Sequence, residues 1–238
     1  MKKIFEKHEL PIAIFLIVLY IVVNSACLNT FGEFSYITAL TNAILSIAIL
    51  SFIVSNKLVD YFKLNKFPNP KKFLYFIPLL LLISVNLLGG LNINNTVPEI
   101  ISYMISMIFV GFLEEIIFRG FLYQSMVKDS ERAAIIVTSL TFGIGHILNL
   151  LNGADIIPTL VQIVYSTTAG FMFVTLLRKG NSLWPCIITH SLVNALSIFN
   201  EPTTITTYVG PIILIVVSVL YTIYLTKRVE VKEWKRLQ

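Results

Sequence analysis

Long apolar runs dominate this sequence and decide what it can fold into. Stretches of roughly 18 to 20 apolar residues recur along the chain, and a helix of that length crosses a ~30 Å hydrocarbon core. The runs do not alternate between polar and apolar residues, which argues against a closed β-barrel. With 56% hydrophobic and 13% charged residues, the 238-residue chain is also unlike a soluble domain. We therefore expect an all-α, polytopic membrane protein with a single transmembrane domain, residues 1–238.

About eight membrane spans are expected, with both termini in the cytoplasm. The spans are Leu10–Cys27, Tyr36–Ser55, Phe73–Leu88, Pro98–Arg119, Arg132–Leu150, Ile156–Leu177, Leu183–Phe199 and Tyr208–Thr226. Apart from Arg119, lysine and arginine precede the first span, follow the last, and occupy every second connection between them. The connections near residues 28–35, 89–97, 151–155 and 200–207 contain neither. This alternation is the positive-inside pattern, which places the basic connections in the cytoplasm.

The same alternation explains the net charge of +5. Because the basic residues mark topology, we expect the lipid bilayer and no nucleic acid as a partner. The basic N-terminus followed by an apolar run is interpreted as a retained first helix rather than a cleaved signal peptide. The longest connection, Asn56–Lys72, mixes aromatic residues with lysines. It lies either along the inner membrane surface or in a plain basic loop, and the pattern leaves both open.

Two adjacent carboxylates and an arginine interrupt the fourth apolar run: Glu114, Glu115 and Arg119. An ionisable residue at bilayer depth costs at least ~2.5 kcal/mol, so it is by default a functional-site hypothesis. Glu115 and Arg119 are four residues apart and share a helix face on which they can pair. Glu114 points about 100° away from Glu115. We predict that Arg119 neutralises Glu115 and that Glu114 is left free for chemistry.

Two histidines, His146 and His190, also lie inside apolar spans. Each alone is equally well explained as a packing residue, and the small residues Gly143 and Gly145 suggest a close helix contact near the first. The expected depth of these histidines and of Glu114 in the membrane favours a shared site. At ~1.5 Å per residue, Glu114 and His146 each lie roughly 21 Å from the nearest basic connection, and His190 lies roughly 16 Å from one. Three spans thus bring an acid and two imidazoles into one layer, which predicts a water-activating centre.

Three short patterns carry a family resemblance. Glu114-Glu115-x-x-x-Arg119, Phe142-x-x-x-His146 and His190-x-x-x-Asn194 resemble the three motifs of the CAAX protease and bacteriocin-processing family, also called Abi, of intramembrane endopeptidases. They occur in this order on the fourth, fifth and seventh spans. The resemblance covers about residues 98–199, the expected catalytic core.

The resemblance implies a role for each motif residue. Glu114 is the expected general base, and His146 helps to hold and polarise the water. His190 and Asn194 stabilise the oxyanion or complete a metal site, while Glu115, Arg119 and Phe142 are structural supports. A divalent metal such as zinc, on Glu114, His146 and His190, and a metal-free mechanism both stay open. The chain has no His-Glu-x-x-His helix that would preform a metal site.

The function implied is peptide-bond hydrolysis by a multi-pass enzyme of the plasma membrane. The expected substrate is a peptide or a lipidated protein at the membrane, in CAAX-type C-terminal processing or in bacteriocin maturation or immunity. Two other classes are considered. A proton-coupled transporter would use the same Glu and His residues as a relay, but the sequence shows no paired broken helices or repeats. A non-catalytic membrane scaffold would keep the motifs for stability alone.

Overall fold

The computed structural model describes residues 2–203 and 205–230, and these are almost entirely helical. The α-helices are α1 (Lys2–Lys7), α2 (Glu9–Phe31), α3 (Tyr36–Ser55), α4 (Ile77–Ser84), α5 (Val97–Glu115), α6 (Tyr123–Met126), α7 (Glu131–Gly145), α8 (Ile156–Gly180), α9 (Trp184–Leu196) and α10 (Gly210–Arg228). Shorter 3₁₀ or π segments are η1 (Pro70–Phe76), η2 (Val85–Leu87), η3 (Ile116–Leu122), η4 (His146–Asn152), η5 (Ser197–Phe199) and η6 (Ile205–Val209). Within the described ranges no strand forms, and Leu91 and Asn200 share one isolated bridge. The all-α prediction is confirmed.

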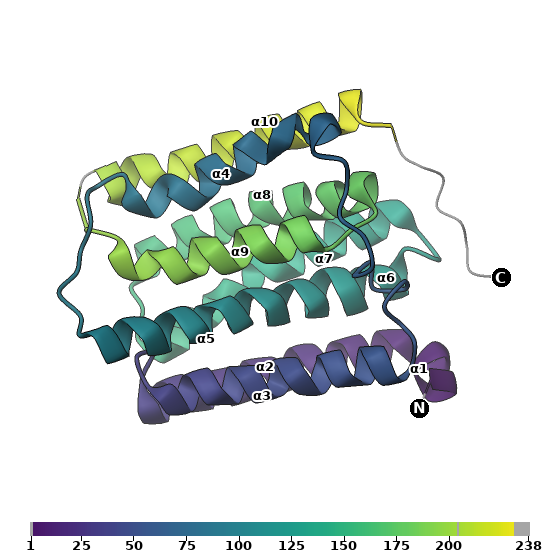
Figure 1. The fold of residues 1–238 in the computed structure, drawn as a ribbon, viewed down its shortest axis with the longest axis horizontal. Helices are drawn as coiled ribbons and strands as arrows, with labels where there is room; N and C mark the ends of the chain where they lie inside the picture. Colours follow the sequence, from purple (N-terminus) through teal and green to yellow (C-terminus); the bar gives the residue numbers. More distant parts are fainter. Residues whose placement is uncertain (1, 204, 231–238) are drawn as a thin grey trace.

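The long helices run side by side in layers (Figure 1). The pair α2 and α3 forms one outer layer, and α4 with α10 forms the opposite one. Between them, α5 packs against α3 and α9, and α8 packs against α7 and α10. The three motifs are carried by α5, α7 and α9. These helices therefore lie between the two outer layers.

Seven helical segments of the described chain are long and apolar enough to cross a membrane, and they coincide with seven of the eight predicted spans. The predicted span Leu183–Phe199 is the exception, because its helical segment, Trp184–Phe199, is shorter than that. This segment lies between α5 and the layer of α4 and α10 (Figure 1). Since much of its surface is covered by neighbouring helices, it does not need the length of a helix that faces lipid.

Both ends of the described chain lie at one end of the bundle. Figure 1 shows α1 and the last turn of α10 at the same end, together with α6 and the connection before α4. The basic connections gather there, as predicted from their alternation along the sequence. By the positive-inside rule this is the cytoplasmic end.

The connection Asn56–Lys72 follows neither of the two interpretations drawn from its sequence. Leu58, Phe62 and Leu64 are buried in the hydrophobic core, and the Phe62 ring centroid lies 4.5 Å from that of Phe121. The segment is thus folded into the cytoplasmic end of the protein. Apolar burial outweighs any gain from lying on the membrane surface, because the aromatic side chains fill space between helices.

Polar contacts also join this segment to the start of α2. The hydroxyl of Tyr61 donates to Glu9 at 2.8 Å, and Lys128 forms an ion pair with the same carboxylate. Burial, and then the bond to Glu9, raises the pKa of Tyr61 above its usual range. The connection between α3 and α4 is therefore tied to α2 and to the end of α6.

Packing is much denser in the cytoplasmic half than in the other half. In α8, the residues from Met172 to Leu177 are all buried, whereas Ile156, Ile157 and Leu160 at its beginning are exposed. The large side chains that are fully buried follow the same pattern: Phe5, Ile53, Phe62, Leu113, Ile116, Ile117, Arg119, Tyr123, Met172, Leu176, Leu177 and Leu183. The cytoplasmic half thus holds most of the densely packed core, beside an apolar groove between α1, α2 and α3, and the larger cavity lies toward the other end.

Candidate active site

The two adjacent carboxylates stand at the end of α5, where the helix changes its hydrogen bonding. Glu115 is the last residue of α5, and the π-helical segment η3 follows directly. Gly120, which the sequence marks as a plausible break in the fourth span, lies inside this segment. Single π turns inside α-helices are frequent at functional sites because they shift side chains relative to the regular register.

Glu115 and Arg119 form the predicted ion pair. The distance from Arg119 Nη1 to Glu115 Oε1 is 2.9 Å, and both side chains are fully buried. The guanidinium carbon also lies 4.0 Å from the centroid of the Phe142 ring. A cation over an aromatic face is attracted by the ring quadrupole, most strongly away from water. Phe142 therefore contacts the arginine that compensates Glu115, a support that its motif position alone did not specify.

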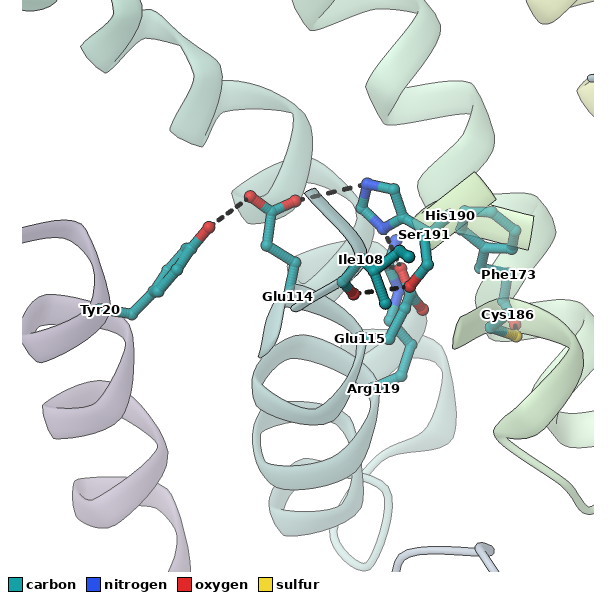
Figure 2. A network of polar contacts seen from close by, with 9 residues as sticks. All are labelled: Tyr20, Ile108, Glu114, Glu115, Arg119, Phe173, Cys186, His190 and Ser191. Carbon is teal, nitrogen blue, oxygen red and sulfur yellow. Dashed lines mark hydrogen bonds and ion pairs between the residues drawn. The ribbon is translucent and has the colours of Figure 1, made fainter. Parts of the chain in front are cut away.

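Glu115 has a second partner that sequence spacing did not indicate. Its Oε1 lies 2.8 Å from Nδ1 of His190 on α9 (Figure 2). Because Arg119 compensates the charge of Glu115, this carboxylate acts as an acceptor and Nδ1–H is the donor. A hydrogen bond at one ring nitrogen sets the role of the other. The contact thus directs Nε2 of His190 toward Glu114.

Glu114 points away from Arg119, as predicted, and faces other groups. Its Oε2 lies 3.5 Å from Nε2 of His190, and its Oε1 accepts a hydrogen bond of 3.0 Å from the hydroxyl of Tyr20. Figure 2 shows the carboxylate between Tyr20 of α2 and His190 of α9. Sequence reasoning missed Tyr20, which sits in the first apolar run with no spacing that relates it to α5.

His190 is further held by aromatic rings on two sides. The Phe173 ring stacks on the imidazole with centroids 5.9 Å apart, and Phe142 approaches its edge at 5.6 Å. Phe173 was also missed, because an apolar residue in an apolar span carries no distinguishing signal. The imidazole is therefore oriented both by Glu115 and by packing.

His146 and Asn194 join Glu114 and His190 in the wall of one cavity of about 610 Å³. His146 begins η4, directly after α7, and its ring meets the edge of Phe142 with centroids 5.5 Å apart. The cavity is also lined by amide and hydroxyl side chains: Asn24, Asn86, Tyr103, Asn149, Asn152, Gln162, Tyr165, Ser166, Thr189, Ser197 and Ser218. All four residues predicted as catalytic thus face one polar space inside an apolar bundle, with Glu114 and His190 in direct contact.

The donor set does not form a ready metal site. Among the described residues, no group of three or more His, Cys, Asp or Glu side chains is arranged so that it could hold a metal ion. Cys27 and Cys186 are free cysteines and neither joins such a group. A bound zinc stays a prediction, and the chemistry below is built from the chain's own side chains.

A comparison with known families agrees with the motifs. Residues 96–196 match the family model described as type II CAAX prenyl endopeptidase Rce1-like. The match covers less than half of the 238-residue chain and shows that this segment is similar to that family. The match contains all seven predicted site residues and nearly coincides with the expected core, residues 98–199. No curated protein and no solved structure gives a significant match to the chain.

The similarity of this segment supports a general function as a CAAX-type intramembrane protease that acts on a membrane-associated peptide or protein. With its apolar helices, the chain is a multi-pass membrane protein. Two side chains outside the three motifs contact motif residues: Tyr20 of α2 bonds Glu114, and Phe173 of α8 stacks on His190. The first of these comes from a helix that the family match does not include.

Proposed function

We propose that this chain is an integral-membrane endopeptidase of the plasma membrane that hydrolyses a peptide bond with a water molecule activated by Glu114 and His146. The observation that supports it best is the contact of 3.5 Å between Glu114 Oε2 and His190 Nε2. The contact lies in the wall of a polar cavity that His146 and Asn194 also line. An acid, two imidazoles and a carboxamide around one space are the groups that peptide hydrolysis needs.

The contacts of His190 support one protonation state for the resting site. His190 Nδ1–H donates to Glu115, so Nε2 of a neutral ring and the carboxylate of Glu114 would both be acceptors. One proton therefore lies between Nε2 and Oε2. With this proton, the charges of Glu114, Glu115, Arg119 and His190 sum to zero, which avoids an uncompensated charge inside the membrane.

In the reacting state this proton is on His190, and Glu114 is a free carboxylate. Glu114 takes a proton from a water molecule that His146 helps to hold, and the water oxygen attacks the carbonyl carbon of the scissile bond. The oxyanion that forms accepts hydrogen bonds from His190 Nε2–H and from the amide of Asn194. Glu114 then passes its proton to the leaving nitrogen, and the C–N bond breaks.

Two substrate classes fit this proposal. One is the C-terminal region of a CAAX-type lipidated protein, and the other is a small peptide that is matured at the membrane, including a bacteriocin or a peptide linked to immunity. In both, water attacks a carbonyl that has to reach Glu114 inside the bundle.

The substitution Glu114→Gln tests the proposal. It removes the base and keeps the size of the side chain, so the purified protein in liposomes should lose cleavage of both a prenylated CAAX peptide and an unlipidated aliphatic peptide, while its unfolding midpoint changes little. Glu99→Gln is the matched control, since it makes the same change near the start of the same helix, where Glu99 accepts hydrogen bonds from Thr96. Full activity of Glu114→Gln would refute the assignment of the base.

A further inference from the structure

The cavity that holds Glu114 extends toward one end of the bundle. Its lining includes Glu33 from the connection between α2 and α3, and Asn152, Gly153 and Ala154 from the connection before α8. These connections lie at the end opposite to α1 and α6 (Figure 1). From there the cavity reaches inward to Glu114.

Toward the other end, the side chains next to Glu114 are densely packed. Leu113, Ile116, Ile117, Met172 and Leu176 are each at most 1% exposed. The buried ion pair of Glu115 with Arg119 lies on this side as well. An apolar groove of about 420 Å³ lies at the end that carries α1, and its lining includes Phe5, Leu113 and Ile117 but not Glu114. The packed side chains of Leu113 and Ile117 therefore separate this groove from Glu114.

The distribution of basic residues tells which side of the membrane each end faces. No lysine or arginine occurs in the four connections at the open end, whereas the connections at the densely packed end carry them. The bias of Lys and Arg in short connections is what sets the orientation of membrane proteins. The densely packed end is thus cytoplasmic and the cavity faces the opposite side.

The side chains that line the cavity limit which kinds of peptide can bind in it. Amide and hydroxyl side chains are its commonest polar groups, and each can both donate to and accept from a peptide backbone. The carboxylates Glu33 and Glu114 are its acidic groups, and among the described lining residues there is no lysine or arginine. A free C-terminal carboxylate would find no lysine or arginine to pair with there, and the proton on His190 is already compensated by Glu114, while an internal segment with neutral or basic side chains would be accommodated.

We propose that the site is loaded from the extracytoplasmic side with an internal segment of a polypeptide that is secreted or anchored at that face. This inference rests on the proposed function for the identity of the reaction, and on the cavity and the charge pattern for its direction. It makes a peptide that has already crossed the membrane the substrate, in preference to the C-terminus of a cytosolic lipidated protein.

Cysteine labelling tests the direction of access without relying on catalysis. In a Cys27→Ser background, where Cys186 is fully buried, three single variants are compared. Asn149→Cys places a thiol in the cavity wall, Asn94→Cys marks the exposed connection before α5, and Asp129→Cys marks the exposed connection after α6. Each is treated with a sulfonated, membrane-impermeant maleimide in right-side-out and in inverted membrane vesicles.

We expect Asn149→Cys and Asn94→Cys to be labelled in right-side-out vesicles and Asp129→Cys only in inverted ones. Labelling of Asn149→Cys only in inverted vesicles, or a reversal of the two surface markers, would overturn the proposal.

Cleavage is measured in the same preparations with quenched fluorescent peptides whose ends are blocked, and with matched peptides that end in a free carboxylate close to the scissile bond. We expect cleavage of the blocked peptides in right-side-out vesicles and its loss in Glu114→Gln. Cleavage confined to inverted vesicles, or to peptides with the free carboxylate, would overturn the inference. Labelling from the outer face with no cleavage of any peptide would instead contradict the proposed endopeptidase function and leave the direction of access supported.

Discussion

Glu115 is the residue through which the other charged groups of the site are connected. One of its oxygens lies 2.9 Å from Arg119 Nη1 and 2.8 Å from His190 Nδ1. Its side chain is fully buried and does not line the cavity. Glu115 is therefore a positioning residue, which orients His190 and depends on Arg119 for its own charge compensation.

The dependence of Glu115 on Arg119 predicts the effect of Arg119→Ala. This change leaves a buried carboxylate without its cation and should lower the free energy of unfolding by about 3–5 kcal/mol. Denaturant unfolding in detergent micelles measures it. The double variant Glu115→Gln with Arg119→Met carries no unpaired charge and should recover most of the loss. Equal instability of the double variant would show that packing of the guanidinium, rather than charge, is what matters.

Tyr20 gives a prediction about activity rather than stability. A hydrogen bond to a charged group contributes about 1.5–3 kcal/mol, so Tyr20→Phe loosens the Glu114 carboxylate while keeping the ring. We expect kcat to fall about tenfold, which corresponds to ~1.4 kcal/mol of activation free energy. Tyr103→Phe is the matched control, because Tyr103 lines the same cavity but bonds Ser197. An equal loss of kcat in both variants would argue against a specific role of Tyr20.

At the scale of helices, the placement of His146 depends on how closely α7 meets α8. A Cβ atom added at Gly143 would lie 2.9 Å from the carbonyl oxygen of Ile163 and closer still to the Thr167 side chain. A Cβ at Gly145 would meet nothing within 4 Å. The close contact expected from these small residues is thus present at Gly143 and absent at Gly145.

This difference makes the two glycines a matched pair for mutation. Gly143→Ala should force the helices apart, lower stability by about 1–3 kcal/mol and reduce peptide cleavage, because the same helix carries Phe142 and leads into His146. Gly145→Ala should be neutral or stabilise the helix by roughly 0.5–1 kcal/mol. Thermal unfolding of both variants measures the effect. Equal midpoints would contradict the close helix contact.

At the scale of the whole molecule, the two halves of the bundle differ in what surrounds the backbone. Amide hydrogen exchange is slow where buried contacts are dense and faster beside water. In lipid nanodiscs, peptides that cover residues 170–177 of α8 should exchange more slowly than peptides that cover residues 156–166, which border the cavity. Exchange followed by mass spectrometry tests this. Equal protection along α8 would contradict a hydrated cavity in the outer half.

Helix periodicity explains which parts of the site could be predicted. The pair of Glu115 with Arg119, and the separate direction of Glu114, follow from positions on one helix, where geometry relates residues that are close in sequence. The common depth of Glu114 and His190 follows in the same way from counting residues along straight spans. Tyr20, Phe173 and the Nδ1 contact of His190 could not be predicted, because they depend on which helices become neighbours.

The sequence by itself determined the helical membrane class, the approximate spans, and the residues that carry charge within those spans. These follow from local rules, since a helix in lipid must form all its backbone hydrogen bonds internally and must bury or pair its charged side chains. Only the tertiary structure decided that Glu115 orients His190, that the connection Asn56–Lys72 is folded into the core, and that the cavity reaches Glu114 from the end without basic residues. Each of these depends on contacts between segments far apart in the chain, which no local pattern encodes.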